Sequence, residues 1–336
     1  MMPSACDPNT PALPQAGEVL SRVALTPANP ALGSIRVRLA GVWHDRRDAA
    51  GRFDRMTAHG PEVREHPLAE LALRAARVGA AAIAAVAAQG DVRPDVKTGA
   101  HDLVTAADRA SEAAIIEVIR ADRPDDAILG EESGAHPGIS GVRWLVDPLD
   151  GTANFVYGRP DFAVSVGVES AGAIVAGAII RPSDGRWVLA DVTMSEISIG
   201  AELSPPQTTK LAGRQHVSAA PNDEVHAVDA LVSFGLPYAI SARQTALAIM
   251  RAAVPHIRGV RIGGSAACDF LAWAHGECDA FVGCGLAEWD TAAGQAIVLA
   301  AGGAVRNVET SDFDILLAAS PPLAAELSDI VGALSR

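Results

Sequence analysis

The sequence predicts a layered α/β fold, and three observations lead to it. Hydrophobic residues make up 49% of the 336 residues, which is enough to bury an extended core. Short apolar runs of strand length alternate with longer amphipathic runs of helix length. These runs come in blocks, without the regular strand–helix–strand rhythm of a doubly wound sheet. A layered sandwich of alternating α and β elements (α+β) is therefore the better prediction.

Two helices open the body of the protein. The first is predicted over residues 67–89, because Pro67 suits the first position of a helix and Gly90 suits its end. The second is predicted from Thr105 or Ala106 to Ala121, where alanine and isoleucine residues form an apolar stripe. Two short buried strands are predicted after these helices, over residues 127–130 and 144–146.

An antiparallel meander is predicted next, because turn-forming residues separate three apolar runs, 162–168, 174–180 and 187–190. The rest of the chain alternates shorter strands and helices. The predicted strands are 231–234, 280–282 and 315–318, and the predicted helices are 244–253, 265–274, 291–301 and 321–334.

The chain divides into three regions. Residues 1–66 are predicted to be an N-terminal appendage that is partly disordered, because prolines punctuate its first half and no amphipathic period is present. Within it, Ile35, Val37 and Leu39 alternate with arginines, which is typical of a short edge strand. Residues 67–190 and 191–336 are predicted to form the two halves of the body.

Composition excludes several classes of partner. The net charge is −13 and no basic run occurs, so neither nucleic acid nor a membrane surface is an expected partner. The four cysteines show no zinc-ligand spacing, which favours a reducing compartment. The N-terminus lacks the basic start and apolar run that are typical of a signal peptide, and the longest Ala/Val/Ile-rich stretch, 78–88, is too short to span a bilayer. A cytoplasmic protein is expected.

The segment from Asp147 to Thr152 is the most informative part of the sequence. A buried strand leads to Asp147, and Pro148 has no N–H group, so the chain is expected to leave the sheet there. Asp150 and Gly151 then form a turn into a helix-like segment, 153–157, whose first N–H groups could hold a phosphate. Two carboxylates beside a bound phosphate would repel it unless a hard cation such as Mg²⁺ lies between them.

Two further acidic segments lie at comparable positions. Glu131 and Glu132 follow a buried strand, and Asp290 precedes the predicted helix 291–301. Each segment has an ordinary alternative: a loop turn for Asp147–Gly151, a solvated surface pair for the two glutamates, and a helix N-cap for Asp290. Three acidic clusters, each beside apolar core, together favour a metal site.

The chain resembles the inositol monophosphatase family over roughly residues 67–334. The order and spacing of five segments carry the resemblance: Lys97–Thr98 with Asp102–Asp108, Glu131–Ser133, Asp147–Thr152, Gly264–Ala267 and Trp289–Gly294. The resemblance implies a Mg²⁺-dependent phosphomonoesterase that hydrolyses a small sugar, cyclitol or inositol phosphate by direct attack of a metal-activated water. It also implies two or three Mg²⁺ ions, with Mn²⁺ as a substitute, a homodimer, and inhibition by lithium.

The resemblance also implies a role for individual residues. Glu131, Thr152 and Asp108 would be catalytic, orienting and deprotonating the attacking water. On residues alone, Asp108 could equally be a first-turn helix acid, and Thr152 a helix-start hydroxyl. The implied metal ligands are Glu131, Asp147, the carbonyl of Leu149, Asp150 and Asp290. The implied phosphate- and substrate-binding residues are Asp150, Gly151, Thr152, Gly264, Ser265, Ala266 and Asp290.

One departure from the family pattern bears on the substrate. Gly283 stands where inositol-specific members carry a glutamate that binds the hydroxyl groups of the substrate. A site without that acceptor should recognise a polyol less well. Alternatives are a 3′-phosphonucleotide or histidinol phosphate as substrate, or a regulatory or binding protein on the same fold with weak catalysis. A haloacid-dehalogenase type of phosphatase, with Asp147 as covalent nucleophile, is a further alternative, although its motif has different spacing.

Overall fold

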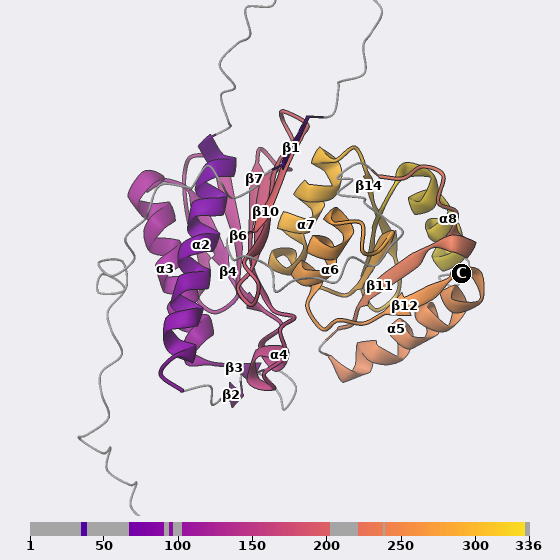
Figure 1. Cartoon of the computed structure of the whole chain (residues 1–336), viewed down its shortest axis with the longest axis horizontal. Coiled ribbons are helices and arrows are strands. Elements are labelled where there is room, and N and C mark those ends of the chain that lie inside the picture. Colours follow the sequence, from indigo (N-terminus) through magenta and orange to yellow (C-terminus); the bar gives the residue numbers. More distant parts are fainter. Residues whose placement is uncertain are drawn as a thin grey trace, which may run out of the picture.

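The computed structural model describes residues 35–38, 67–90, 94–96, 103–201, 221–237 and 239–332. Five layers follow one another across the molecule (Figure 1). Helices α2 and α3 cover the outer face of a first sheet, and α6 and α7 lie between this sheet and a second one. Helices α5 and α8 cover the far face of the second sheet. The layered α/β sandwich predicted from the sequence is confirmed.

The helices begin and end close to the predicted positions. Helix α2 begins at Pro67, and Thr105 is the N-cap of α3, as the sequence indicates. In the described part of the chain, no helix is both long enough and apolar enough to cross a membrane. The helix bounds are α2 (Pro67–Ala87), α3 (Ala106–Asp122), α4 (Thr152–Val156), α5 (Ile240–Ala253), α6 (Ala266–Ala274), α7 (Glu288–Ala300) and α8 (Pro321–Gly332).

The first sheet contains the predicted meander. Its strand order is β1-β10-β9-β8-β7-β6-β4-β5, and β6 to β10 are antiparallel neighbours. Strand β1 pairs with β10, so four residues of the predicted N-terminal appendage form the edge of this sheet. The bounds are β1 (Ile35–Arg38), β4 (Ala127–Gly130), β5 (Gly134–His136), β6 (Val142–Asp150), β7 (Ala163–Ser170), β8 (Ala173–Arg181), β9 (Arg186–Asp191) and β10 (Glu196–Ala201).

The second sheet is smaller and mixed. Its order is β12-β11-β13-β15-β14, with β11 parallel to both β12 and β13. Strands β12 and β14 were not predicted, because they lie at the sheet edges and none of their residues is fully buried. The bounds are β11 (Leu231–Gly235), β12 (Gly259–Arg261), β13 (Ala280–Cys284), β14 (Ala304–Glu309) and β15 (Asp314–Ala319), and a separate hairpin joins β2 (Asp95–Val96) to β3 (Leu103–Val104).

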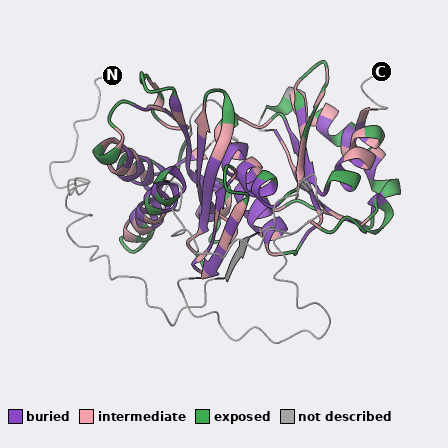
Figure 2. Ribbon diagram, turned by 90° about the horizontal axis from the view of Figure 1, so that it is seen from above, coloured by how far each residue is buried: buried purple, intermediate pink, exposed green. Residues whose placement is uncertain are grey.

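The middle layer fixes the two sheets relative to each other. Figure 2 shows that the two helices between the sheets are mostly buried. Glycines allow this close packing: a Cβ atom at Gly167 would lie 2.5 Å from the Cβ of Ala292. A Cβ atom at Gly294 would lie 2.0 Å from the ring of Phe270, which joins α7 to α6. The position of α7 relative to the first sheet is therefore set by backbone contact, and α7 carries Asp290.

Candidate metal and phosphate site

Parallel pairing of β4 with β6 brings the first acidic segment beside the second. Gly130 is level with Val146 in this pairing, and the N–H of Glu131 donates to the carbonyl of Val146 at 3.1 Å. The carboxyl ends of the two strands therefore lie at the same edge of the sheet, as expected for parallel neighbours. Glu131 comes directly after β4 and lies next to Asp147.

A β-bulge brings Asp147 and Asp150 to the same face of the sheet. The expectation that the chain leaves the sheet at Pro148 is wrong, because β6 continues to Asp150. Asp147 pairs with Ser165 and Asp150 with Ala163, so three residues on β6 span two on β7. The extra residue absorbs the proline, which cannot donate to the ladder. Because Ser165 and Ala163 share a face, their two aspartate partners do too.

Asp290 reaches the site from the first turn of α7. This helix begins at Glu288, three residues earlier than predicted, so Asp290 is not the N-cap residue. Its carboxylate accepts a hydrogen bond from the N–H of Ala287 at 2.8 Å, which stabilises the start of the helix. Helix α7 packs against β6, β7 and β8, and the hydroxyl of Ser165 lies 3.5 Å from the carbonyl of Trp289.

The acidic side chains strongly influence one another. Asp147 and Asp150 are only 2% and 8% exposed. Burial raises the pKa of Asp147 well above its usual value, and the charges of Glu131, Asp150 and Asp290 raise it further. Burial raises the pKa of Asp150 to about 7, although hydrogen bonds from Ala267 and Ser265 act against this. No arginine or lysine of the described residues forms an ion pair with Asp147 or Asp150.

Asp108 and Thr152 form a hydrogen-bonded pair at one side of these carboxylates. The hydroxyl of Thr152 lies 2.9 Å from the Asp108 carboxylate and 3.1 Å from the Leu149 carbonyl. The second oxygen of Asp108 accepts from the N–H and the hydroxyl of Thr105, at 2.7 and 2.6 Å. Asp108 is therefore also the first-turn acid of a capping box. Burial raises its pKa, and these hydrogen bonds partly oppose the shift.

The start of α6 encloses the other side. Ser265 is the N-cap residue of α6, accepts from the N–H of Cys268 at 3.1 Å, and donates to Asp150 at 2.8 Å. The N–H of Ala267 donates to the same Asp150 oxygen. Gly151 lies against this turn at φ +92°, and a Cβ atom there would lie 3.1 Å from the Cβ of Ser265. Helix α4 has only five residues, so few peptide dipoles add up at its N-terminus.

Three polar residues beside the site were not predicted, whereas the predicted Lys97, Thr98 and Asp102 lie outside the described residues. Sequence reasoning missed Asn154, whose amide donates to the carbonyls of Asp161 and Gly263 at 2.7 and 2.9 Å and so links α4 to the loop before α6. It also missed Ser111 and Glu112, polar residues on the buried face of α3. Their position among buried alanines and isoleucines was the available signal.

The donor set fits a hard divalent cation. Glu131, Asp147, Asp150 and Asp290 offer carboxylate oxygens, and the Leu149 carbonyl has a second lone pair besides the one facing Thr152. Burial, together with repulsion from the neighbouring carboxylates, raises the pKa of Asp147, and bound positive charge would stabilise its ionised form. Among the described residues, no three Asp, Glu, His or Cys side chains already surround one point at ligand distance. The carboxylates therefore lie near one another, but their oxygens do not yet surround a common point as the ligands of a metal ion would.

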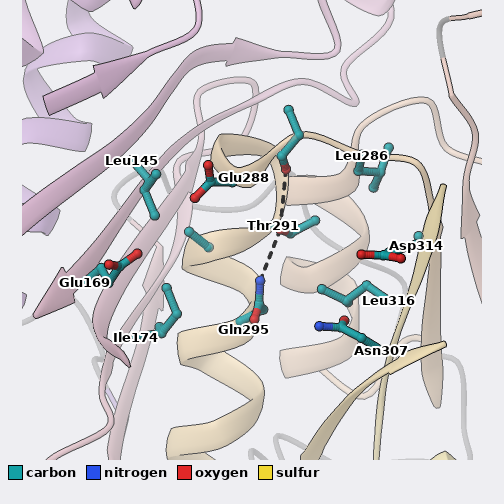
Figure 3. Close-up of a pocket in the computed structure, with 13 residues that line it drawn as sticks. Leu145, Glu169, Ile174, Leu286, Glu288, Thr291, Gln295, Asn307, Asp314 and Leu316 are labelled. Atoms are coloured by element: carbon teal, nitrogen blue, oxygen red, sulfur yellow. Dashed lines mark hydrogen bonds between the residues drawn. The ribbon is translucent and has the colours of Figure 1, made fainter. Parts of the chain in front are cut away.

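Gly283 lies in the wall of a cavity of about 330 Å³ along α7 (Figure 3). Glu288, Thr291 and Gln295 line it from one face of the helix, and none of the four clustered carboxylates does. A Cβ atom at Gly283 would lie 2.9 Å from both the Cδ1 of Leu286 and the ring of Phe281. Apolar side chains thus fill the space that a longer residue at position 283 would need.

The layered α/β fold and the buried carboxylates beside a glycine turn are features expected of a phosphoric monoester hydrolase that uses a metal ion. Comparison with known proteins agrees. The model of the inositol monophosphatase family matches residues 64–331. The chain therefore belongs to the inositol monophosphatase family, whose members are in general metal-dependent.

Relatives and solved structures share most of the chain. The inositol-1-monophosphatase SuhB of Mycobacterium tuberculosis is 34% identical over 250 residues, 72% of this chain and 82% of that protein. The Nus factor SuhB of Haemophilus influenzae is 35% identical over 251 residues, 74% of this chain and 86% of that protein. The crystal structure of the extragenic suppressor protein SuhB of Bartonella henselae aligns with a TM-score of 0.65 at 29% identity, covering 78% of this chain and 97% of that one.

Proposed function

We propose that this protein is a Mg²⁺-dependent phosphomonoesterase of small phosphate esters. The observation that carries the proposal is the convergence of Glu131, Asp147, Asp150 and Asp290 from three elements of the fold, with the pKa of Asp147 raised by burial and by the other three. Such a cluster in a largely buried position needs positive charge, and carboxylate oxygens are the ligands that Mg²⁺ prefers. When bound, Mg²⁺ would acidify the attacking water and stabilise the negative charge that develops on the ester.

The protein's own residues would do the remaining work. Glu131 would accept the proton of the attacking water, since its carboxylate adjoins Asp147 at the end of β4. Thr152 would orient that water, because Asp108 fixes its hydroxyl from behind. The Thr152 hydroxyl donates its one proton to Asp108, and its oxygen can then accept a hydrogen bond from the water. Ser265 would fix Asp150 through their 2.8 Å hydrogen bond.

The leaving group is proposed to be a sugar, cyclitol or inositol, with a 3′-phosphonucleotide or histidinol as the alternative. Position 283 argues against tight recognition of inositol, because Gly283 offers no acceptor and Leu286 and Phe281 occupy the adjacent space. A site that lacks a hydroxyl-binding group discriminates weakly among polyols. We therefore expect myo-inositol 1-phosphate to be a slower substrate than the best ester of a broad panel.

A phosphate-release assay on such a panel, with Mg²⁺ and with a chelator, tests the proposal. We expect release from at least one ester with Mg²⁺ and none with the chelator. Asp150→Asn should lower kcat/KM on the order of a hundredfold or more, since metal ions contribute several kcal/mol to such reactions and about 1.4 kcal/mol is a tenfold change. The matched control is Asp329→Asn, which changes an exposed aspartate on α8. Equal activity of both variants would contradict the proposal.

A second candidate is a regulatory protein with weak catalysis, which is favoured by relatives that are named Nus factors at 33–35% identity. This candidate predicts that folded wild-type protein releases no phosphate from any ester of the panel, with or without Mg²⁺. Phosphate release that depends on both Mg²⁺ and Asp150 excludes it as the main activity.

A further inference from the structure

Helix α3 presents a polar face to the acidic site. Asp108, Ser111 and Glu112 lie at positions i, i+3 and i+4, and all are buried, at 0%, 0% and 3% exposure. Each contacts a different segment of the site. Asp108 accepts a hydrogen bond from the side-chain hydroxyl of Thr152, and the hydroxyl of Ser111 donates to the backbone carbonyl of Pro148 at 2.8 Å. Glu112 binds the segment that follows β4.

Glu112 makes the most complete of these contacts. One carboxylate oxygen accepts from the N–H of Glu132 at 2.9 Å, and the other accepts from the N–H of Ser133 at 2.7 Å. Both donors belong to the backbone directly after Glu131. Hydrogen bonds from backbone N–H groups to a buried carboxylate are strong and directional, so this pair fixes how the chain turns at residue 131.

The Glu112 carboxylate packs closely against the end of β4. A Cβ atom at Gly130 would lie 2.5 Å from one carboxylate oxygen of Glu112, so a larger residue there would have to displace this carboxylate from its two backbone donors. The N–H of Glu131 itself is held by Val146. The backbone on both sides of the Glu131 side chain is thus fixed, by β6 on one side and by Glu112 on the other.

We propose that Glu112 is a positioning residue, which holds the Glu131 segment in the geometry that a divalent cation requires. This inference rests on the proposed function. Residues that orient metal ligands from behind typically change metal affinity by about ten- to a hundredfold when they are replaced. Both oxygens of Glu112 accept from backbone donors, so Glu112 would act through the Glu131 segment and not as a metal ligand or catalytic residue.

The test compares Glu112→Gln with wild type. Glutamine keeps the volume and one acceptor but places an NH₂ group against the second N–H donor. We expect the Mg²⁺ concentration at half-maximal phosphate release to rise roughly tenfold or more, with a smaller change in KM for the ester. We also expect a smaller rise in melting temperature on adding Mg²⁺, and faster hydrogen exchange at the amides of Glu132 and Ser133. Glu117→Gln, on the exposed face of the same helix, is the matched control.

The melting and exchange measurements do not require catalysis, so they test the inference even if no ester is hydrolysed. Glu112→Gln with the same Mg²⁺ response and the same amide exchange as Glu117→Gln would overturn it. If Glu112→Gln does not fold, exchange of the wild-type protein decides: fast exchange at Glu132 and Ser133 overturns the inference, and protection supports it. A wild type whose melting temperature does not respond to Mg²⁺ would instead contradict the metal site.

Discussion

Replacement of Gly151 by alanine tests whether the turn between Asp150 and Thr152 requires glycine for two separate reasons. Gly151 has φ +92°, a left-handed conformation that costs an L-residue roughly 1–2 kcal/mol. Its new Cβ atom would also lie 2.9 Å from the carbonyl oxygen of Asp161 and 3.1 Å from the Cβ of Ser265. Overpacking of this kind adds roughly 1–3 kcal/mol. The expected total loss of unfolding free energy is roughly 2–5 kcal/mol.

Gly158 provides the control for the conformational part. It has φ +69°, but a Cβ atom there would meet nothing within 4 Å. Gly158→Ala should therefore lose only about 1–2 kcal/mol. Urea unfolding without added metal measures both variants. Phosphate release should fall by about a hundredfold in Gly151→Ala only, because a 1 Å displacement of the turn moves Thr152 and Asp150. Equal losses of stability and activity in the two variants would refute the reasoning.

Three further predictions concern the surrounding structure. Gly294→Ala should destabilise the protein by several kcal/mol in urea unfolding and lower activity, because the new Cβ would lie 2.0 Å from the Phe270 ring; near-wild-type stability would contradict the packing described. Burial raises the pKa of Asp269 from its ordinary value of 3.8 to about 7, so the folded state holds this proton at higher pH than the unfolded chain does. The stability that protonated Asp269 contributes is present below pH 4 and is lost as pH rises through 7, so the melting temperature of the metal-free protein should fall over this range. Asp269→Asn should flatten that fall, and an unchanged slope would count against this explanation. Arg143→Met removes ion pairs with two partly exposed glutamates, so urea unfolding should show a loss below about 1 kcal/mol, and a much larger loss would show that screening is overestimated.

The sequence predicted the helices and the meander well because their apolar periodicity is strong. It failed at Pro148, where the missing N–H was interpreted as the end of the strand. A bulge is a cooperative property of two strands, since it needs Ser165 and Ala163 on β7 to accept the extra residue. Nothing local to β6 indicates it. The bulge is also what places Asp147 and Asp150 on one face, so the acidic site depends on a feature that one segment alone does not reveal.

The supporting residues of the site show a similar limit. The acidic residues and Thr152 were identified from motifs, and the structure joins Thr152 to Asp108 by a hydrogen bond. Glu112 was missed because its partners, the amides of Glu132 and Ser133, lie 20 and 21 residues away along the chain. Backbone partners have no signature in the sequence, so such contacts become visible only once α3 is packed against the first sheet.

Direct measurement of divalent-cation binding tests the central claim that the clustered carboxylates hold a metal ion. Calorimetric titration of Mg²⁺ or Mn²⁺ into wild type, Asp147→Asn and Asp329→Asn separates the buried site from the acidic surface. We expect saturable binding by wild type and by Asp329→Asn, and an affinity at least about tenfold weaker for Asp147→Asn, whose neutral amide replaces the most buried carboxylate of the cluster. Equal affinity of Asp147→Asn and wild type, or no saturable binding by wild type, would contradict it.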